Sequence, residues 1–248
     1  MILLIDIGNT RVKWVTYAGQ TLESYQWLSL RNSDWSGQLA SIFTDMERPV
    51  KVVAANVAGP QAAEIIAGVI PRTWQVTPEF VHTGVEFAGL KNGYRDPAQL
   101  GIDRWAAMVA AWIECGSAFC LVSCGTAITV DLVNDTGMHL GGYIIPGIDL
   151  MRDSLLNATG LIKSYDLKSH DMLPGTTTTA CVNNGTSKAA ASLVDRVLAE
   201  ARSDMGEELS CKLTGGAAEV LDSLIDEKFE NDPMLVLKGL ELITREKL

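Results

Sequence analysis

The start of the chain has a strand pattern interrupted by a short polar turn. An apolar run at residues 2–5 leads to Asp6, and the polar sequence Gly8, Asn9 and Thr10 follows it. Beyond the turn, apolar residues return at alternate positions. Alternation with a period of two is typical of a half-buried strand, so this segment predicts a tight β-hairpin.

The turn of this hairpin carries the groups that bind nucleotide phosphates. Asp6 stands where a carboxylate can hold Mg²⁺ directly or through water. Glycine allows close backbone approach, so the turn's N–H groups and the Thr10 hydroxyl can meet phosphate oxygens, and Lys13 can reach the same phosphates. An ordinary hairpin with a solvated carboxylate is the alternative interpretation.

A second segment, residues 119–132, repeats this plan. Its apolar run ends at Ser123, which takes the position of Asp6, and Gly125 takes the position of Gly8, with Thr126 following. Internal repetition is stronger evidence than either hairpin alone. It predicts a duplicated fold with a nucleotide gripped between the two halves.

The rest of the pattern predicts a mixed α/β chain, because strands alternate with helices. In the first half we expect strands at 21–28, 50–55 and 74–81 and helices at 38–46 and 60–67. In the second half we expect helices at 149–156 and 188–202, a polar loop at 163–179, a strand at 211–214 and a last helix at 235–248 that packs back on the first half.

An Ala-rich apolar segment follows Asp96 and Pro97, a pair that predicts a helix start. Asp103 and Arg104 interrupt its apolar character. Two interpretations are open: the pair is solvated, or Asp103 points into a cleft as a general base while Arg104 holds an anion. Tyr94 lies just upstream and can line the same cleft.

Composition narrows the function classes. The 248 residues suffice for one large or two modest domains, and a net charge of −10 argues against a nucleic-acid or anionic-membrane partner. The chain starts without a basic n-region, and its longest apolar run, 105–113, is far too short for a bilayer span, so we expect a cytoplasmic protein. Five cysteines without a Cys-x-x-Cys pair and three scattered histidines predict neither a disulfide framework nor a zinc site.

Six short motifs, taken in order, resemble the signatures of type III pantothenate kinases, a family of the actin, Hsp70 and sugar kinase superfamily. They are D-I-G-N-T at 6–10, N-G-Y at 92–94, G-I-D-R at 101–104, G-T-A at 125–127, G-G-Y-I-I-P-G at 141–147 and L-T-G-G at 213–216. The resemblance implies duplicated ribonuclease H-like (actin-like ATPase) α/β domains with an interdomain nucleotide cleft. We place the domains at 1–115 and 116–248.

The resemblance also implies roles for individual residues. It makes Asp103 the proton acceptor and places Asp6 near magnesium. ATP and its phosphates are expected at Asp6, Gly8, Asn9, Thr10, Lys13, Thr126, Gly215 and Gly216. Pantothenate is expected at Tyr94, Gly101, Ile102, Asp103, Arg104 and Thr178, the last often supplied across a homodimer interface and ambiguous by a residue among its neighbouring threonines.

One position departs from the family pattern. Family members usually have Asp-x-Gly-Thr in the second hairpin, and that carboxylate is associated with a potassium or ammonium ion. Here the sequence is Ser123-Cys124-Gly125-Thr126. A neutral hydroxyl supplies one oxygen and no charge, so we expect weak or absent potassium activation.

The function implied is ATP- and Mg²⁺-dependent phosphorylation of pantothenate to 4'-phosphopantothenate, the first committed step toward coenzyme A. Two alternatives stand beside it: another small-molecule kinase of the superfamily, and a non-catalytic nucleotide-binding regulator in which Ser123 has disabled catalysis. An acceptor screen and a test for nucleotide binding without turnover separate the three.

Overall fold

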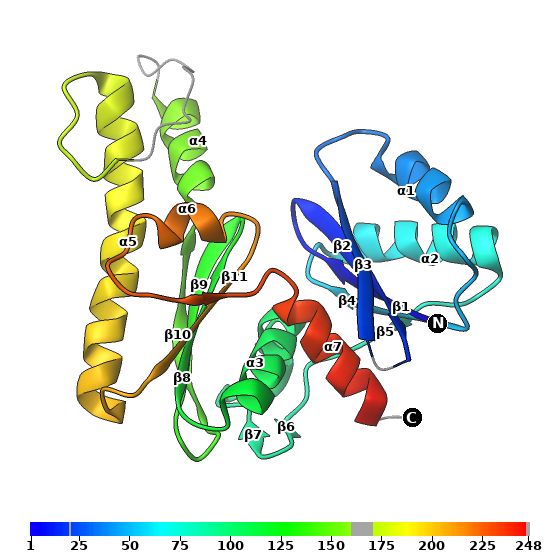
Figure 1. Ribbon diagram of the computed structural model, residues 1–248. Helices are drawn as coiled ribbons and strands as arrows, with labels where there is room; N and C mark the ends of the chain where they lie inside the picture. The colour runs from blue at the N-terminus through cyan, green and yellow to red at the C-terminus, as the bar shows by residue number, and fades with distance from the viewer. Residues whose placement is uncertain (20, 160–170, 247–248) are drawn as a thin grey trace. The chain divides into compact units, whose positions relative to one another are not determined.

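The computed structural model describes residues 1–19, 21–159 and 171–246, and its chain forms two compact units (Figure 1). Unit 1 comprises Met1–Glu114 together with the C-terminal segment that begins at Met234, and unit 2 comprises Cys115–Pro233. The expected second domain, 116–248, therefore extends too far, because the residues from Met234 onward belong to unit 1. The C-terminal segment belongs to unit 1 because its helix packs on the sheet of that unit.

Unit 1 is built on a five-stranded sheet in the order β3-β2-β1-β4-β5. Strands β1 and β2 form the expected antiparallel hairpin, and β4 runs parallel to β1. The elements are β1 (Ile2–Ile7), β2 (Arg11–Ala18), β3 (Thr21–Ser29), α1 (Trp35–Thr44), β4 (Lys51–Asn56), α2 (Pro60–Trp74), β5 (Glu79–Phe80), β6 (Glu86–Phe87), β7 (Leu90–Lys91), the 3₁₀ turn η1 (Pro97–Gln99), α3 (Ile102–Cys115) and α7 (Leu235–Glu246).

The two faces of this sheet have different partners. Strand alternation turns Ile5 and Ile7 toward α1 and α2, where they join one apolar core. Asp6 lies between them and therefore faces the other side of the sheet. Helix α7 packs against β1 and β4, and Gly239 lets it approach the backbone of α3 closely, because a Cβ at this position would collide with the carbonyl of Ala106.

Unit 2 repeats the arrangement with a sheet in the order β10-β9-β8-β11-β12. Strands β8 and β9 form the second hairpin, and β11 runs parallel to β8 just as β4 runs parallel to β1. The elements are β8 (Phe119–Cys124), β9 (Ala127–Val133), β10 (His139–Pro146), α4 (Ile148–Ala158), α5 (Thr178–Met205), β11 (Ser210–Thr214), α6 (Ala218–Asp222) and β12 (Glu230–Asn231). The shared strand order shows that the duplication extends over the whole of each sheet.

Two expectations about single elements were wrong. Residues 74–81 do not form one strand: α2 continues to Trp74, because Ala62, Ile66, Ile70 and Trp74 form one buried helical face, and only β5 is extended. Asp96 caps η1 by accepting the N–H of Ala98 at 3.2 Å, and α3 begins only at Ile102.

The polar loop expected at 163–179 is confirmed in part. Residues 163–170 lie outside the described part, residues 171–177 form neither helix nor strand, and α5 already begins at Thr178. The Thr177 hydroxyl caps this helix by accepting the N–H of Ala180 at 3.1 Å.

Candidate active site

The first hairpin places Asp6 and Lys13 opposite each other at the end of β1. They are paired residues in the strand register, and Lys13 Nζ lies 3.4 Å from Asp6 Oδ2. The turn is closed by a hydrogen bond from the N–H of Gly8 to the carbonyl of Arg11 at 3.0 Å. Burial raises the pKa of Asp6, and the nearby Lys13 ammonium opposes that rise. The hairpin therefore holds a buried carboxylate and an ammonium beside a glycine turn.

The start of α3 brings Asp103 to the same region of unit 1. Its Oδ1 atom accepts the backbone N–H of Arg104 at 2.9 Å, and a Cβ at Gly101 would lie only 2.6 Å from that oxygen. Burial is the main cause of the raised pKa of Asp103, and the charge on Asp6 adds to it. A solvated acid–base pair, one of the two interpretations above, does not fit these surroundings.

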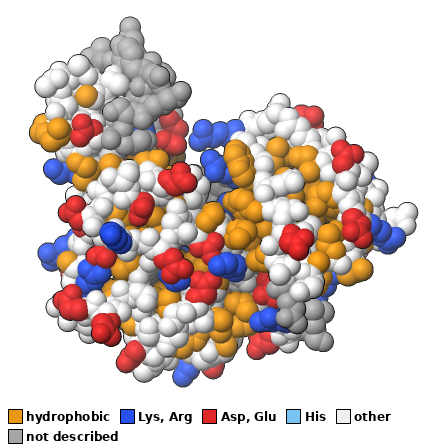
Figure 2. Space-filling model, viewed as in Figure 1, with side chains coloured by type: hydrophobic (Ala, Val, Ile, Leu, Met, Phe, Trp, Pro, Cys, Tyr) orange, Lys and Arg blue, Asp and Glu red, His pale blue; other side chains and the backbone are white. Residues whose placement is uncertain are grey.

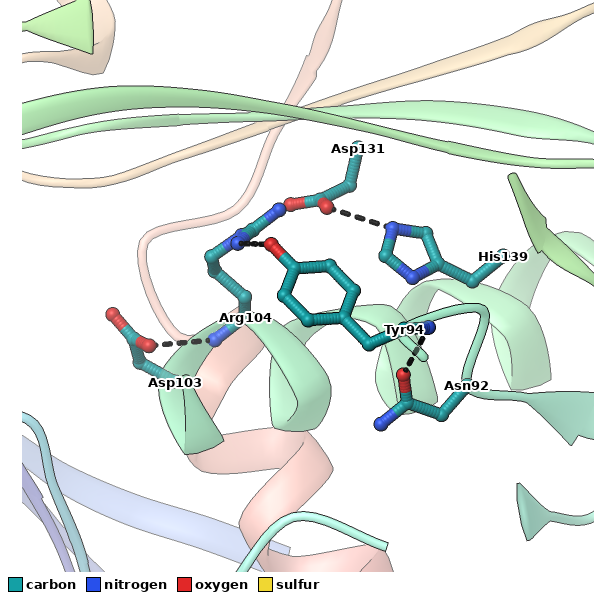
Figure 3. Close-up of polar contacts among 6 residues, drawn as sticks. All are labelled: Asn92, Tyr94, Asp103, Arg104, Asp131 and His139. Carbon is teal, nitrogen blue, oxygen red and sulfur yellow. Dashed lines mark hydrogen bonds and ion pairs between the residues drawn. The ribbon is translucent and has the colours of Figure 1, made fainter. Parts of the chain in front are cut away.

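Arg104 is buried, with 7% of its surface exposed, and its Nη1 donates a hydrogen bond to the Tyr94 hydroxyl at 2.7 Å. Figure 3 shows Arg104 and Tyr94 pointing toward each other, with Asp103 bonded to the backbone of the same turn. A guanidinium is a planar group with N–H donors of fixed direction, and such donors suit carboxylate and phosphate groups.

Asn92 is a residue whose role sequence reasoning missed. Its side-chain oxygen accepts the N–H of Tyr94 at 3.0 Å (Figure 3). Its amide nitrogen donates to the carbonyls of Gly84 and Pro97 at 3.1 and 3.2 Å. It thereby fixes the loop that carries Tyr94. The Asn-Gly-Tyr motif was the available signal, but nothing in a single sequence gives these three bonding partners.

In unit 2 the second hairpin and the Gly215 loop touch each other. The N–H of Gly125 donates to the carbonyl of Ala127 at 2.9 Å, which closes the turn next to Thr126. Gly215 has φ +106°, and a Cβ there would collide with the carbonyl of Cys124. Only glycine suits this position, because the backbones meet and φ is positive.

Cys124 of this hairpin and His139 of the adjacent strand are both buried. Cys124 is buried, and burial with the nearby Asp149 charge raises the pKa of its thiol to about 12, so it is no nucleophile. His139 Nε2 lies 2.9 Å from Asp131 Oδ1, and both side chains are buried (Figure 3).

The metal-binding potential of the site rests on single carboxylates. Among the residues that the structure describes, no three His, Cys, Asp or Glu side chains are grouped to hold a metal ion. One buried carboxylate next to a glycine turn suits Mg²⁺, which typically takes one or two carboxylates together with substrate phosphates and water. Ser123 pairs in register with Thr214 and Thr129, so its strand neighbours in the sheet are neutral hydroxyl residues.

Thr178 lies in unit 2, in the first turn of α5. Together with α4, this helix lines a groove of about 650 Å³. The groove is bounded by Met151, Ser154, Leu155, Thr178, Cys181, Val182, Gly185, Thr186 and Ala189. Its lining is mainly apolar.

The surface gives no sign of a polyanion-binding face in the view of Figure 2, where basic and acidic side chains are interspersed. None of the helices within residues 1–19, 21–159 and 171–246 is long and apolar enough to cross a membrane.

Comparisons with known proteins give one consistent result. The family model described as type III pantothenate kinase matches residues 2–200. Proteins named type III pantothenate kinase from Nitrosococcus oceani and Marinobacter nauticus are 35% and 38% identical to the chain, over 99% and 98% of it and over 94% and 98% of their own lengths.

Two solved structures share the fold at low sequence identity. The activator of the 2-hydroxyisocaproyl-CoA dehydratase from Clostridium difficile, with bound ADPNP, has a TM-score of 0.54 at 12% identity, over 99% of this chain and 94% of that one. Component A of the (R)-2-hydroxyglutaryl-CoA dehydratase from Acidaminococcus fermentans has a TM-score of 0.53 at 14% identity, over 97% and 95%. These likenesses bear out the expected duplicated α/β fold.

Proposed function

The chain belongs to the type III pantothenate kinase family, and we propose that Asp6, Asp103 and Arg104 carry out the family's reaction from unit 1. The reaction is the ATP-dependent phosphorylation of pantothenate to 4'-phosphopantothenate in coenzyme A biosynthesis. The single observation that carries the assignment of the base is the surroundings of Asp103, a carboxylate with a raised pKa beside a buried arginine.

Asp103 accepts the proton of the attacking primary hydroxyl. A general base works best when its pKa lies near the operating pH, and burial and the Asp6 charge both move the pKa of Asp103 upward in that direction. The hydrogen bond from the Arg104 N–H holds one carboxylate oxygen, Oδ1, and leaves Oδ2 for the substrate.

Arg104 binds the pantothenate carboxylate. Its charge favours this partner, and its bond to the Tyr94 hydroxyl limits the directions in which the guanidinium can point. Asn92 supports the arrangement through the backbone of Tyr94.

Asp6 and Lys13 serve the phosphates of ATP. Asp6 would hold Mg²⁺, directly or through water, and the ion would supply positive charge that neutralises the phosphate oxygens. Lys13 contributes a positive charge from the neighbouring strand, while Gly8, Asn9 and Thr10 form the turn. Phosphoryl transfer requires mainly such positioning and charge stabilisation.

In unit 2, Thr126 of the second hairpin contacts a phosphate of the nucleotide, and Gly215 and Gly216 contact its adenosine. The contact between Gly215 and the Cys124 carbonyl supports this pairing of loops. A K⁺ or NH₄⁺ ion, usual in the family, is held weakly or not at all because Ser123 carries no charge.

The protein acts as a cytoplasmic homodimer, in which Thr178 of the partner subunit contacts pantothenate. The position of Thr178 at the start of a helix beside an apolar groove supports this assignment.

The test is ADP release by the purified protein with ATP and Mg²⁺, with and without pantothenate, in sodium and then in potassium buffer. We expect pantothenate-dependent release in sodium, with little gain in potassium. Release that ignores pantothenate but responds to another alcohol would assign a different acceptor. Nucleotide binding without any release would identify a regulator.

A further inference from the structure

Arg11 occupies a position beside the first phosphate turn that the proposed mechanism leaves without a role. It is the first residue of β2, and its carbonyl closes the turn by accepting the Gly8 N–H. Val12 and Trp14 are buried in the core with α1 and α2, so alternation places Arg11 and Lys13 on the opposite face, the face that also carries Asp6.

The two cations on this face have different partners. The Lys13 ammonium lies 3.4 Å from the Asp6 carboxylate, which offsets much of its charge. Within the described part of the chain no carboxylate pairs with Arg11, and its guanidinium carbon lies 4.3 Å from the centre of the Trp27 ring. Arg11 therefore supplies the uncompensated positive charge next to the turn.

Trp27 fixes the orientation of this guanidinium. In the register of β2 and β3, Trp27 faces Lys13 and Arg11 faces Ser29, so the Arg11–Trp27 contact is diagonal across the two strands. The Trp27 side chain remains 49% exposed, so its ring is not core packing. A guanidinium stacked on an aromatic face keeps its N–H groups at the edge of the plane, where they can meet the oxygens of a phosphate in pairs.

We propose that Arg11 binds the terminal phosphate of ATP and that Trp27 is the residue that positions it. The naming of ATP rests on the function proposed above. A phosphate fits better than the carboxylate of pantothenate, because Arg11 adjoins the Gly8–Thr10 turn, whereas the carboxylate site proposed above lies at Arg104 and Tyr94 elsewhere in unit 1.

The experiment compares Arg11→Ala and Arg11→Lys with the control Arg48→Ala, an exposed arginine of the same unit near the opposite end of β1. Calorimetry with Mg²⁺ measures the affinity of β,γ-imido-ATP and of AMP in the absence of pantothenate. We expect Arg11→Ala to weaken the ATP analogue about 10-fold or more, the usual range for a charge-assisted hydrogen bond. The affinity of Arg11→Ala for AMP should equal that of the wild type. The affinity of Arg11→Lys for the ATP analogue should lie between those of the wild type and Arg11→Ala.

Trp27 is tested in the same assay with Trp27→Ala and Trp27→Phe. A positioning role predicts that Trp27→Ala weakens the ATP analogue while Trp27→Phe retains most of its affinity, because a phenyl face still stacks. Melting temperatures of all variants exclude loss of fold.

Kinetics supply the second readout. The KM for ATP should rise in Arg11→Ala and the KM for pantothenate should stay within about 2-fold, as expected for a residue that touches one substrate only. An unchanged affinity for the ATP analogue, or equal losses for the analogue and AMP, would overturn the proposal. A rise confined to the KM for pantothenate would do the same. Wild type that binds the analogue but phosphorylates nothing would reject the proposed function while leaving the Arg11 comparison decisive.

Discussion

The Lys13 ammonium lies 3.4 Å from the Asp6 carboxylate, and that carboxylate in turn raises the pKa of Asp103. The charges of these three side chains, which lie between the first hairpin and the start of α3, are therefore coupled. A change at one of them alters the protonation of the next.

Replacing Asp103 with Asn should lower kcat by about 10² to 10⁴, since the substitution removes a general base and keeps the shape of the side chain. The KM values should change little. Steady-state kinetics with both substrates measure this, with Asp45→Asn, an exposed carboxylate at the end of α1, as the matched control. A kcat equal to that of the control would show that Asp103 is not the general base.

The same substitution should stabilise the protein near neutral pH. The folded-state pKa of Asp103 is raised, so its ionised form is less favourable in the folded chain than in the unfolded one. Its favourable contribution is present at low pH, where the group is protonated, and is lost as the pH rises through the folded pKa. The melting temperature of Asp103→Asn should therefore exceed that of wild type at pH 7, with a gap that closes as the pH falls. A gap that widens on acidification would contradict the raised pKa.

Arg104→Ala should raise the KM for pantothenate about 10-fold or more, because a charge-assisted hydrogen bond to the carboxylate is lost. A neutral pantothenamide, in which an amide replaces the carboxylate, separates charge recognition from packing. Wild type should prefer pantothenate to the amide, and Arg104→Ala should lose that preference. A preference for pantothenate of equal size in both proteins would show that Arg104 does not bind the pantothenate carboxylate.

We expect weak or absent potassium activation of the wild type, and Ser123→Asp should create or strengthen it, because the carboxylate restores the charge that the family resemblance implies at this position. Rates in potassium and sodium chloride at equal ionic strength measure the effect, with Ser123→Asn as a neutral control. A large potassium activation of the wild type would refute this expectation and show that neutral ligands suffice.

Gly215→Ala should weaken nucleotide binding and lower the melting temperature, since its φ of +106° and its contact with the Cys124 carbonyl leave no room for a Cβ. Gly68→Ala in α2 is the matched control. A Cβ at Gly68 would meet open space, so alanine there should stabilise the helix by about 0.5–1 kcal/mol. Equal behaviour of the two variants would contradict the close approach at Gly215.

The hairpins could be predicted from the sequence because a strand's period of two and a glycine turn are local signals, and both lie where expected. The extent of α2 could not, since Gly68 and Pro71 read as helix breakers while the buried face from Ala62 to Trp74 depends on tertiary packing. The start of α3 was misplaced for a related reason. Asp96 and Pro97 are good initiators of a turn, but the turn they begin is η1.

The sequence could predict the residues of the candidate site, but not the neighbouring residues that hold them in place. Nothing in the sequence shows that Asn92 holds the Tyr94 loop, or that Arg11 stacks on Trp27 from a neighbouring strand, because both relationships arise only once the chain has folded. The resemblance to a family supplied roles for Asp103 and Arg104, while the structure supplied the burial that gives those roles a physical basis.

Helix α7 has a consequence for how the protein is made. It lies more than 100 residues beyond α3, yet its buried side chains pack on β1 and β4 of unit 1. In a nascent chain, unit 1 therefore lacks one of its layers until α7 is available. The half that carries Asp6 and Asp103 completes its folding only after residues 235–246 have been synthesised, so catalytic competence is set by the late rather than the early part of translation.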